Sequence, residues 1–76
     1  MKGDFGNMTK KERDNIVKTL KSAMVLRREL ALAYETKYAP SIVYACDKGL
    51  RAKKIPDMRK YDRISAQYER MISNET

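Results

Sequence analysis

The sequence predicts an all-α fold, in which a long N-terminal helix, a short helix and a medium C-terminal helix form a small helical hairpin or bundle. Apolar residues recur at spacings of three and four along most of the 76 residues, and this is the period of an amphipathic helix. Only two prolines and three glycines interrupt the pattern, so the helices have few breaks. A capping-box sequence precedes the first apolar stretch. The first helix carries more apolar surface than so short a chain can cover, so we expect self-association to complete the bundle.

The periodic stretches form a single helical domain over residues 9–72. The helices are expected at about residues 9–38, 41–48 and 58–72. A flexible lead-in at residues 1–8 and a frayed tail at residues 73–76 flank this domain, because chain ends without apolar anchors are poorly ordered.

The first helix begins at Thr9 and Glu12, where each side chain can accept a hydrogen bond from the other residue's backbone amide. Its core-facing stripe consists of Ile16, Leu20, Ala23, Met24, Leu30, Ala31, Tyr34 and Tyr38. A second apolar strip, on other sides of the helix, consists of Val25, Leu26, Leu32 and Ala33. Thirty residues of helix would be about 45 Å long. We therefore expect the second strip to be a partner or oligomer interface; the alternative is that these are scattered surface residues.

Arg27 lies near the middle of the core-facing stripe of the first helix. A guanidinium is costly to bury without a partner. The structural interpretation is therefore an ion pair across the core, with Asp62 or Glu69 as the acid. The functional alternative is an arginine that binds an anionic ligand.

The second helix is bounded by breaking residues. Pro40 ends the first helix and can open the next one. Gly49 is expected to form a left-handed cap after the second helix. Cys46 is expected to be a small buried residue. In the connector that follows, Pro56 is expected to prevent a helix, and Asp57 to cap the third helix.

The third helix is amphipathic. The side expected in the core carries Tyr61, Ile64, Tyr68, Met71 and Ile72. The opposite side carries Arg59, Arg63, Gln67 and Arg70. These three arginines are available for phosphates, because the other side of the same helix supplies the core.

Positive charge is concentrated around the connector. The formal net charge is +7, and residues 48–63 alone hold seven Lys and Arg against two acids. The candidate nucleic-acid or anion-binding residues are Lys48, Arg51, Lys53, Lys54, Arg59, Arg63 and Arg70. A basic patch raises the local concentration of anionic partners, although the same charges also suit a solvated surface.

These features favour a non-catalytic binding protein that contacts nucleic-acid phosphates without strong sequence preference, or an acidic protein surface. The alternative is a small accessory or inhibitor protein, of the kind found in phages and other mobile elements, that binds another protein through a helical surface and acts as a homo-oligomer. Affinity that falls steeply with salt would indicate the first function. An apolar patch that stays exposed in the free protein would indicate the second.

The sequence lacks the residues that metal sites, enzymes and membrane-spanning proteins typically need. The chain has no histidine and one cysteine, Cys46, so the common zinc sites and an intramolecular disulfide are not expected. No nucleophile–base pair or glycine-rich phosphate loop is present, and we expect no enzyme activity, metal or cofactor. No apolar run approaches the ~18 residues of a membrane-spanning helix. We expect a cytoplasmic protein that does not enter membranes.

Two short stretches resemble known families. Ala45, Gly49 and Ile55 have the relative spacing of the small-residue, turn-glycine and hydrophobic positions of helix-turn-helix repressors, which would imply base-specific DNA binding; Pro56 departs from that pattern. Residues 27–31, Arg-Arg-Glu-Leu-Ala, resemble the first helix of small all-helical chorismate mutases. That resemblance implies an anionic substrate bound by arginines and a lysine, but Tyr38 stands at the position of the lysine.

Overall fold

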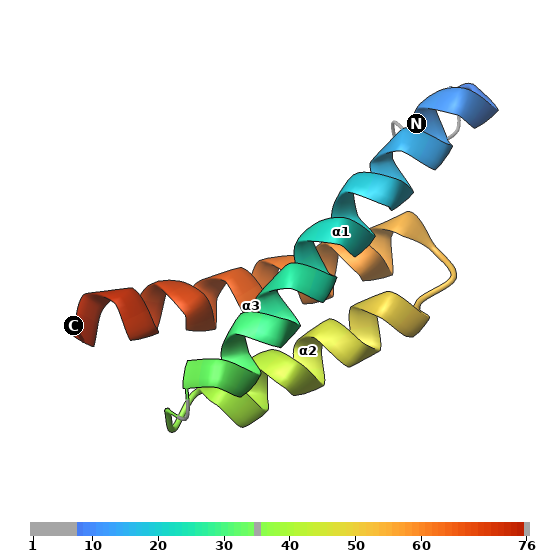
Figure 1. Ribbon diagram of the computed structural model, residues 1–76. Helices are drawn as coiled ribbons and strands as arrows, with labels where there is room; N and C mark the ends of the chain where they lie inside the picture. The colour runs from blue at the N-terminus through green and yellow to red at the C-terminus, as the bar shows by residue number, and fades with distance from the viewer. Residues whose placement is uncertain (1–7, 35, 76) are drawn as a thin grey trace.

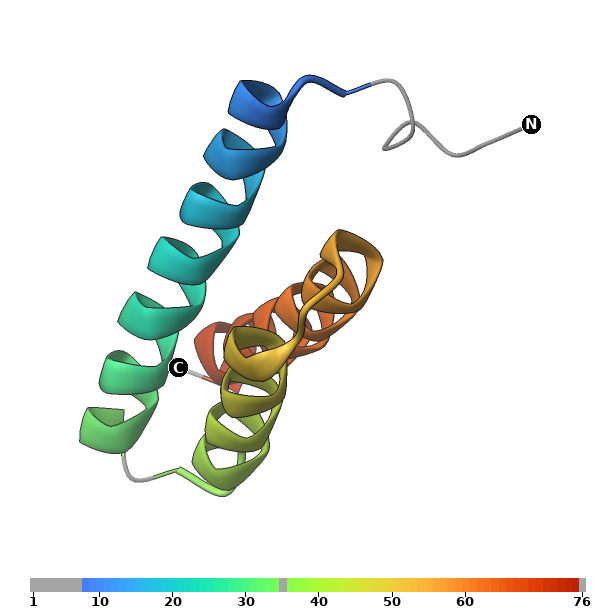
Figure 2. The ribbon, with the colours of Figure 1, turned by 90° about the vertical axis from the view of Figure 1, so that its right-hand side faces the viewer.

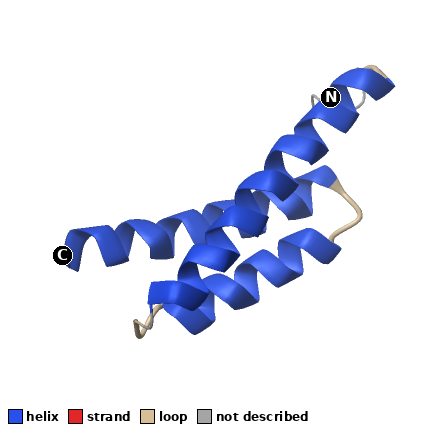
Figure 3. Ribbon diagram, viewed as in Figure 1, coloured by secondary structure: helices blue, strands red, loops and turns tan. Residues whose placement is uncertain are grey.

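The computed structural model describes residues 8–34 and 36–75, which form helices joined by two short turns (Figures 1 and 3). The helices are α1 (Lys10–Tyr34), α2 (Ala39–Arg51) and α3 (Ile55–Glu75). The predicted all-α bundle is confirmed. Of the predicted lead-in only Met8 is described, and residues 1–7, Glu35 and Thr76 lie outside the described residues.

Helices α2 and α3 form an antiparallel hairpin, and α1 packs across both (Figures 1 and 2). The molecule is elongated, with extents of 41 × 22 × 17 Å. The N-terminal end of α1 and the C-terminal end of α3 extend beyond α2 in opposite directions (Figure 1). Parts of both helices therefore keep long surfaces that the other described residues do not cover.

The predicted capping box starts α1. The Thr9 amide donates to Glu12 Oε1 at 2.9 Å, and the Glu12 amide donates to Thr9 Oγ1 at 3.1 Å. The predicted end was wrong by four residues, because α1 stops at Tyr34 instead of Tyr38. The chain needs a turn before α2, and Tyr38 occupies the position that caps α2, where its carbonyl accepts from the Ile42 amide at 3.0 Å. Pro40 then stands in the first turn of α2, where a missing N–H is tolerated.

The predicted glycine cap was also wrong, because Gly49 lies inside α2 and is buried. A Cβ at this position would overlap Met24 Sδ and would lie 3.2 Å from Tyr61 Cβ. Gly49 therefore lets α2 approach both neighbouring helices closely. The helix continues to Arg51 and ends at Ala52, whose extended backbone breaks the helical hydrogen-bonding pattern.

Helix α3 begins three residues earlier than predicted. Pro56 stands in its first turn, and the first hydrogen bond runs from the Met58 amide to the Lys54 carbonyl at 3.1 Å. A proline in the first turn gives up only an N–H that has no helical partner. The connector is consequently three residues long, and Asp57 lies inside the helix rather than capping it. At the other end, α3 runs to Glu75, so most of the predicted frayed tail is helical.

The core lies where the three helices meet. Its fully buried members are Met24 and Ala31 on α1, Ile42, Ala45 and Cys46 on α2, and Ser65 on α3. The predicted stripes were partly shifted. On α1, Val17 packs against the core, whereas Leu30 and Tyr34 are exposed. On α3, the buried line is Met58, Ser65 and Ile72, seven residues apart, which leaves Met71 exposed.

Candidate nucleic-acid interface

The predicted arginine stripe is present on α3. Arg59, Arg63 and Arg70 are all exposed, and Met58, Ser65 and Ile72 on the same helix are buried. At 100° per residue the three arginines fall within about 40° of one another, on the side away from the buried line. Arg59 also borders α1, since it lines a shallow hollow with Asn15, Ile16, Thr19 and Leu20.

Two acids of α3, Asp62 and Glu69, are directed inward, to Arg27 of α1. Arg27 Nη1 donates to Asp62 Oδ1 at 2.9 Å, and Arg27 Nε donates to Glu69 Oε1 at 3.2 Å. Arg27 Nη1 also donates to Ser65 Oγ at 2.7 Å, and this hydroxyl donates to the Asp62 carbonyl at 2.9 Å. The predicted structural ion pair is confirmed, and it uses both candidate acids at once.

This network keeps Arg27 charged. Burial acts to lower the pKa of Arg27, but the hydrogen bonds and charges of Asp62 and Glu69 outweigh it, so that the pKa is raised. Burial also raises the pKa of the Cys46 thiol, against a hydrogen bond with Ser65 and the nearby charge of Arg27. The thiol is therefore neutral at physiological pH, in keeping with a small buried residue.

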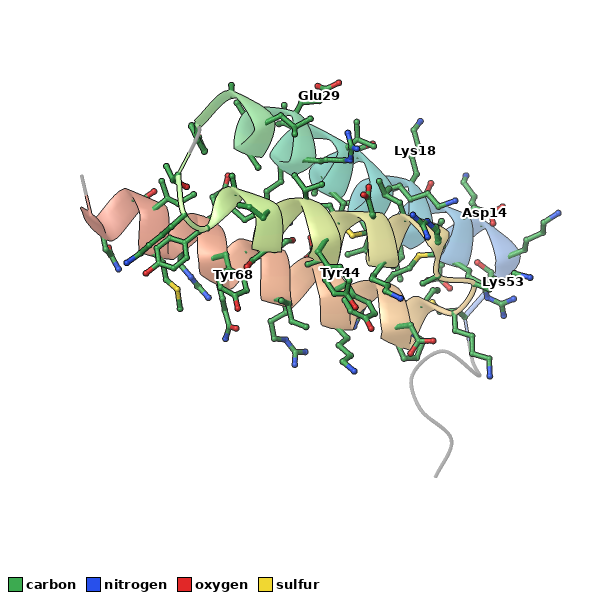
Figure 4. All side chains as sticks on the ribbon, turned by 90° about the horizontal axis from the view of Figure 1, so that it is seen from below. Asp14, Lys18, Glu29, Tyr44, Lys53 and Tyr68 are labelled. Carbon is green, nitrogen blue, oxygen red and sulfur yellow. The ribbon has the colours of Figure 1, made fainter. Side chains whose placement is uncertain are left out.

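The connector forms a second basic group. Lys53 and Lys54 line a hollow of about 300 Å³ together with Arg13 of α1. Figure 4 shows Lys53 at the end of the bundle where α2 turns into α3. Cations from two parts of the sequence, the start of α1 and the connector, therefore line one concave surface together with Val17, Ile55 and Pro56, and such a group of positive charges can attract an anion such as a phosphate.

The remaining predicted cations, Lys48 and Arg51, lie in the last turn of α2. Lys48 Nζ stands 5.5 Å from the centre of the Tyr44 ring, and Arg51 is exposed. Cations in the last turn also interact favourably with the negative end of the helix dipole. These two residues therefore stabilise the end of α2, whether or not they also meet an anion.

Two further cations belong to these groups and were missed in the sequence. Lys60 lies on α3, about 60° around the helix from Arg63, and is exposed. The helical period alone would have placed it at the edge of the stripe. Arg13 meets the connector only through tertiary packing, and no spacing in the sequence indicates that contact.

The second apolar strip of α1 is exposed, with exposed fractions of 44% for Val25, 58% for Leu26 and 58% for Leu32. Ala33 is exposed as well. Leu32 borders an apolar groove of about 400 Å³ between α1 and α2, which Ala39, Pro40 and Tyr44 also line. Tyr44 lies on the face formed by α2 and α3 (Figure 4).

The structure bears on both family resemblances. Pro56 lies in the first turn of α3, so it does not interrupt the helix as the sequence suggested. However, α2 and α3 run antiparallel along each other (Figure 1), whereas the helices of a helix-turn-helix motif meet at about 90–120°. Arg27, the first arginine of the chorismate-mutase-like stretch, forms ion pairs with Asp62 and Glu69 of the same chain.

Comparison of the chain with known protein families, with characterised proteins and with solved structures found no match. Within residues 8–34 and 36–75, no group of three or more acidic or cysteine side chains is arranged to hold a metal ion. None of the described helices combines the length and the apolar character needed to cross a membrane.

Proposed function

We propose that this protein binds the phosphate backbone of nucleic acids, largely without sequence preference, through the outer face of α3 and the neighbouring connector. The observation that carries the proposal is the separation of charge on α3. Between Met58 and Asn74 the only acids are Asp62 and Glu69, and both contact Arg27 on the inward side. Over this length the outward side therefore presents arginines, while the carboxylates of the helix are turned toward α1.

The dimensions of the stripe suit a polyanion. Arg59 and Arg70 are eleven residues apart, which is about 16 Å along a helix. Each strand of a duplex carries one phosphate per about 3.4 Å of the duplex axis, so a stripe of this length faces a segment that holds several phosphates. Arginine side chains on a rigid helix donate to phosphate oxygens without contacting base edges, and this favours binding that is independent of sequence.

The test is a triple variant, Arg59→Gln, Arg63→Gln and Arg70→Gln. Glutamine keeps a good helix propensity, and all three positions are exposed, so the fold should be retained by circular dichroism. Affinity for several unrelated duplexes, measured by fluorescence anisotropy at about 50 mM salt, should fall by a similar factor for each. The slope of log affinity against log salt should shrink by about 0.9 for each phosphate that the variant no longer neutralises.

The matched control removes three cations elsewhere. Lys10 and Lys11 in the first turn of α1 and Lys37 in the turn before α2 are exposed, and replacing all three with Gln lowers the net charge equally. The control should keep most of the affinity and of the salt slope. An equal loss in both variants would show a general charge effect with no defined surface. No binding by the wild-type protein at about 50 mM salt would leave the alternative of a protein partner.

A further inference from the structure

Helix α1 directs an apolar surface away from the other two helices. Val25 and Leu26 line a shallow hollow of about 430 Å³, and its other lining residues are Lys21, Ser22 and Glu29. In Figure 4, Glu29 projects from α1 away from α2 and α3. Leu32, one heptad beyond Val25, continues the apolar surface and is more than half exposed. This surface is the outer face of α1.

The two charged residues that line this hollow have opposite signs and are placed symmetrically about Val25. Lys21 lies four residues before Val25, and Glu29 lies four residues after it. Eight residues of helix separate them by about 12 Å, too far for an ion pair within the chain. Among the described residues, neither has an ion-pair partner.

Such a face is complementary to itself. If a second copy of α1 lies antiparallel on the first, with a two-fold axis passing close to Val25, Lys21 of each copy meets Glu29 of the other. The same axis places Leu32 opposite Lys18, whose aliphatic stem can cover it. An isologous interface requires this property, because one surface must complement its own inverted image.

We propose that the outer face of α1 is a homodimer interface, in which two copies pack antiparallel around Val25 and Leu26 and form two symmetric Lys21–Glu29 ion pairs. The other charges of α1 nearby do not oppose it. Arg27 is paired with Asp62 and Glu69, and Arg28 Nε donates to Asp47 Oδ1 at 2.7 Å. The arginine stripe of α3 belongs to another helix and is not part of this contact.

A single pair of helix faces buries less surface than a standard stable interface, so the dimer is weak. The chain has a mass of 8.9 kDa. Because small interfaces associate weakly, the measurement needs a high protein concentration, of about 200 µM. Sedimentation equilibrium at that concentration should show a mass approaching twice the monomer mass. A monomeric mass would overturn the proposal and leave this face to a different protein.

Charge reversal tests the register. Lys21→Glu and Glu29→Lys should each raise the dimer dissociation constant about tenfold, because each turns both attractive pairs into repulsive ones. The combined variant restores opposite charges, and its dissociation constant should return to within about threefold of the wild-type value. Failure of the combined variant to recover would overturn the antiparallel register.

The two single variants control for each other. Lys21→Glu lowers the net charge and Glu29→Lys raises it, so general repulsion between basic copies would make the first dimerise better and the second worse. Specific pairing weakens both. Lys10→Glu makes the same charge change as Lys21→Glu on an exposed part of α1 outside the face, and should leave dimerisation unweakened. Circular dichroism melting of each variant confirms that α1 remains folded.

Discussion

Arg27 allows a test of how the three helices are held together. Arg27→Met removes the charge and keeps an unbranched chain that fills the space of the aliphatic stem. Asp62→Asn combined with Glu69→Gln keeps the shapes and removes both negative charges. We expect the arginine substitution to be tolerated and the double amide substitution to be strongly destabilising, although all three residues belong to one network.

The difference follows from burial. The Arg27 side chain is 14% exposed, whereas those of Asp62 and Glu69 are 26% and 36% exposed. After Arg27→Met, water can still reach both carboxylates, and Ser65 Oγ still donates to the Asp62 carbonyl at 2.9 Å. This variant should lose about 0–1 kcal/mol. After the amide substitutions a mostly buried guanidinium has no counter-charge, and we expect a loss of about 3 kcal/mol.

Urea denaturation followed by circular dichroism measures these changes. A chain of this size has a slope near 1 kcal/mol per molar urea, so the amide variant should shift the midpoint by about 3 M. Adding Arg27→Met to the amide variant should recover about 2 kcal/mol, since the unpaired charge is then gone. Losses that simply add would refute the reasoning, and so would a larger loss for Arg27→Met than for the amide pair.

Three further predictions concern other sites. Gly49→Ala should lose about 1–2 kcal/mol in urea denaturation, because overpacking against Met24 exceeds the helix-propensity gain of about 1 kcal/mol; a more stable variant would show that room exists. Burial raises the pKa of Cys46. The difference in the free energy of unfolding between the wild-type protein and Cys46→Ala should therefore not vary with pH near neutrality, whereas above about pH 8.5, where the unfolded thiol ionises, the wild-type protein should lose stability relative to the variant. A parallel pH dependence of the two proteins would contradict this. The double substitution Val25→Gln and Leu26→Gln should lower the affinity for a long duplex, which has room for two copies, more than the affinity for a short duplex, because the dimer would carry two arginine stripes. Equal losses on both lengths would count against simultaneous binding of the two stripes.

The features that the sequence predicted correctly rest on local geometry or on a strong chemical need. The capping box of Thr9 and Glu12 involves residues three apart, and a single turn of helix contains the whole interaction. Arg27 on an apolar stripe needs an acid, and Asp62 and Glu69 are seven residues apart on one amphipathic helix. Both therefore reach the same side of α3.

The errors arose where one residue type has two uses. Gly49 was expected to end α2, but a glycine inside a helix also permits close packing, and only the positions of Met24 and Tyr61 distinguish the two. Pro56 was expected to prevent a helix, yet it is compatible with a first turn. Ser65 was overlooked as the centre of the buried line on α3, because a polar residue does not contribute to an apolar pattern.

Ser65 connects the fold with the candidate binding surface. Because its hydroxyl accepts from Arg27 at 2.7 Å and is fully buried, the side of α3 that carries Ser65 must face α1. Asp62 and Glu69 lie within about 60° of Ser65 on the helix, so the same rotation that buries the hydroxyl turns both acids toward Arg27. It also turns the arginine stripe outward. A rotation of α3 that buried Ile64 and Met71 instead would have turned Asp62 and Glu69 away from Arg27 and exposed them on the same surface as the stripe. The network that stabilises the bundle thus also determines which charges the outer face of α3 presents to solvent.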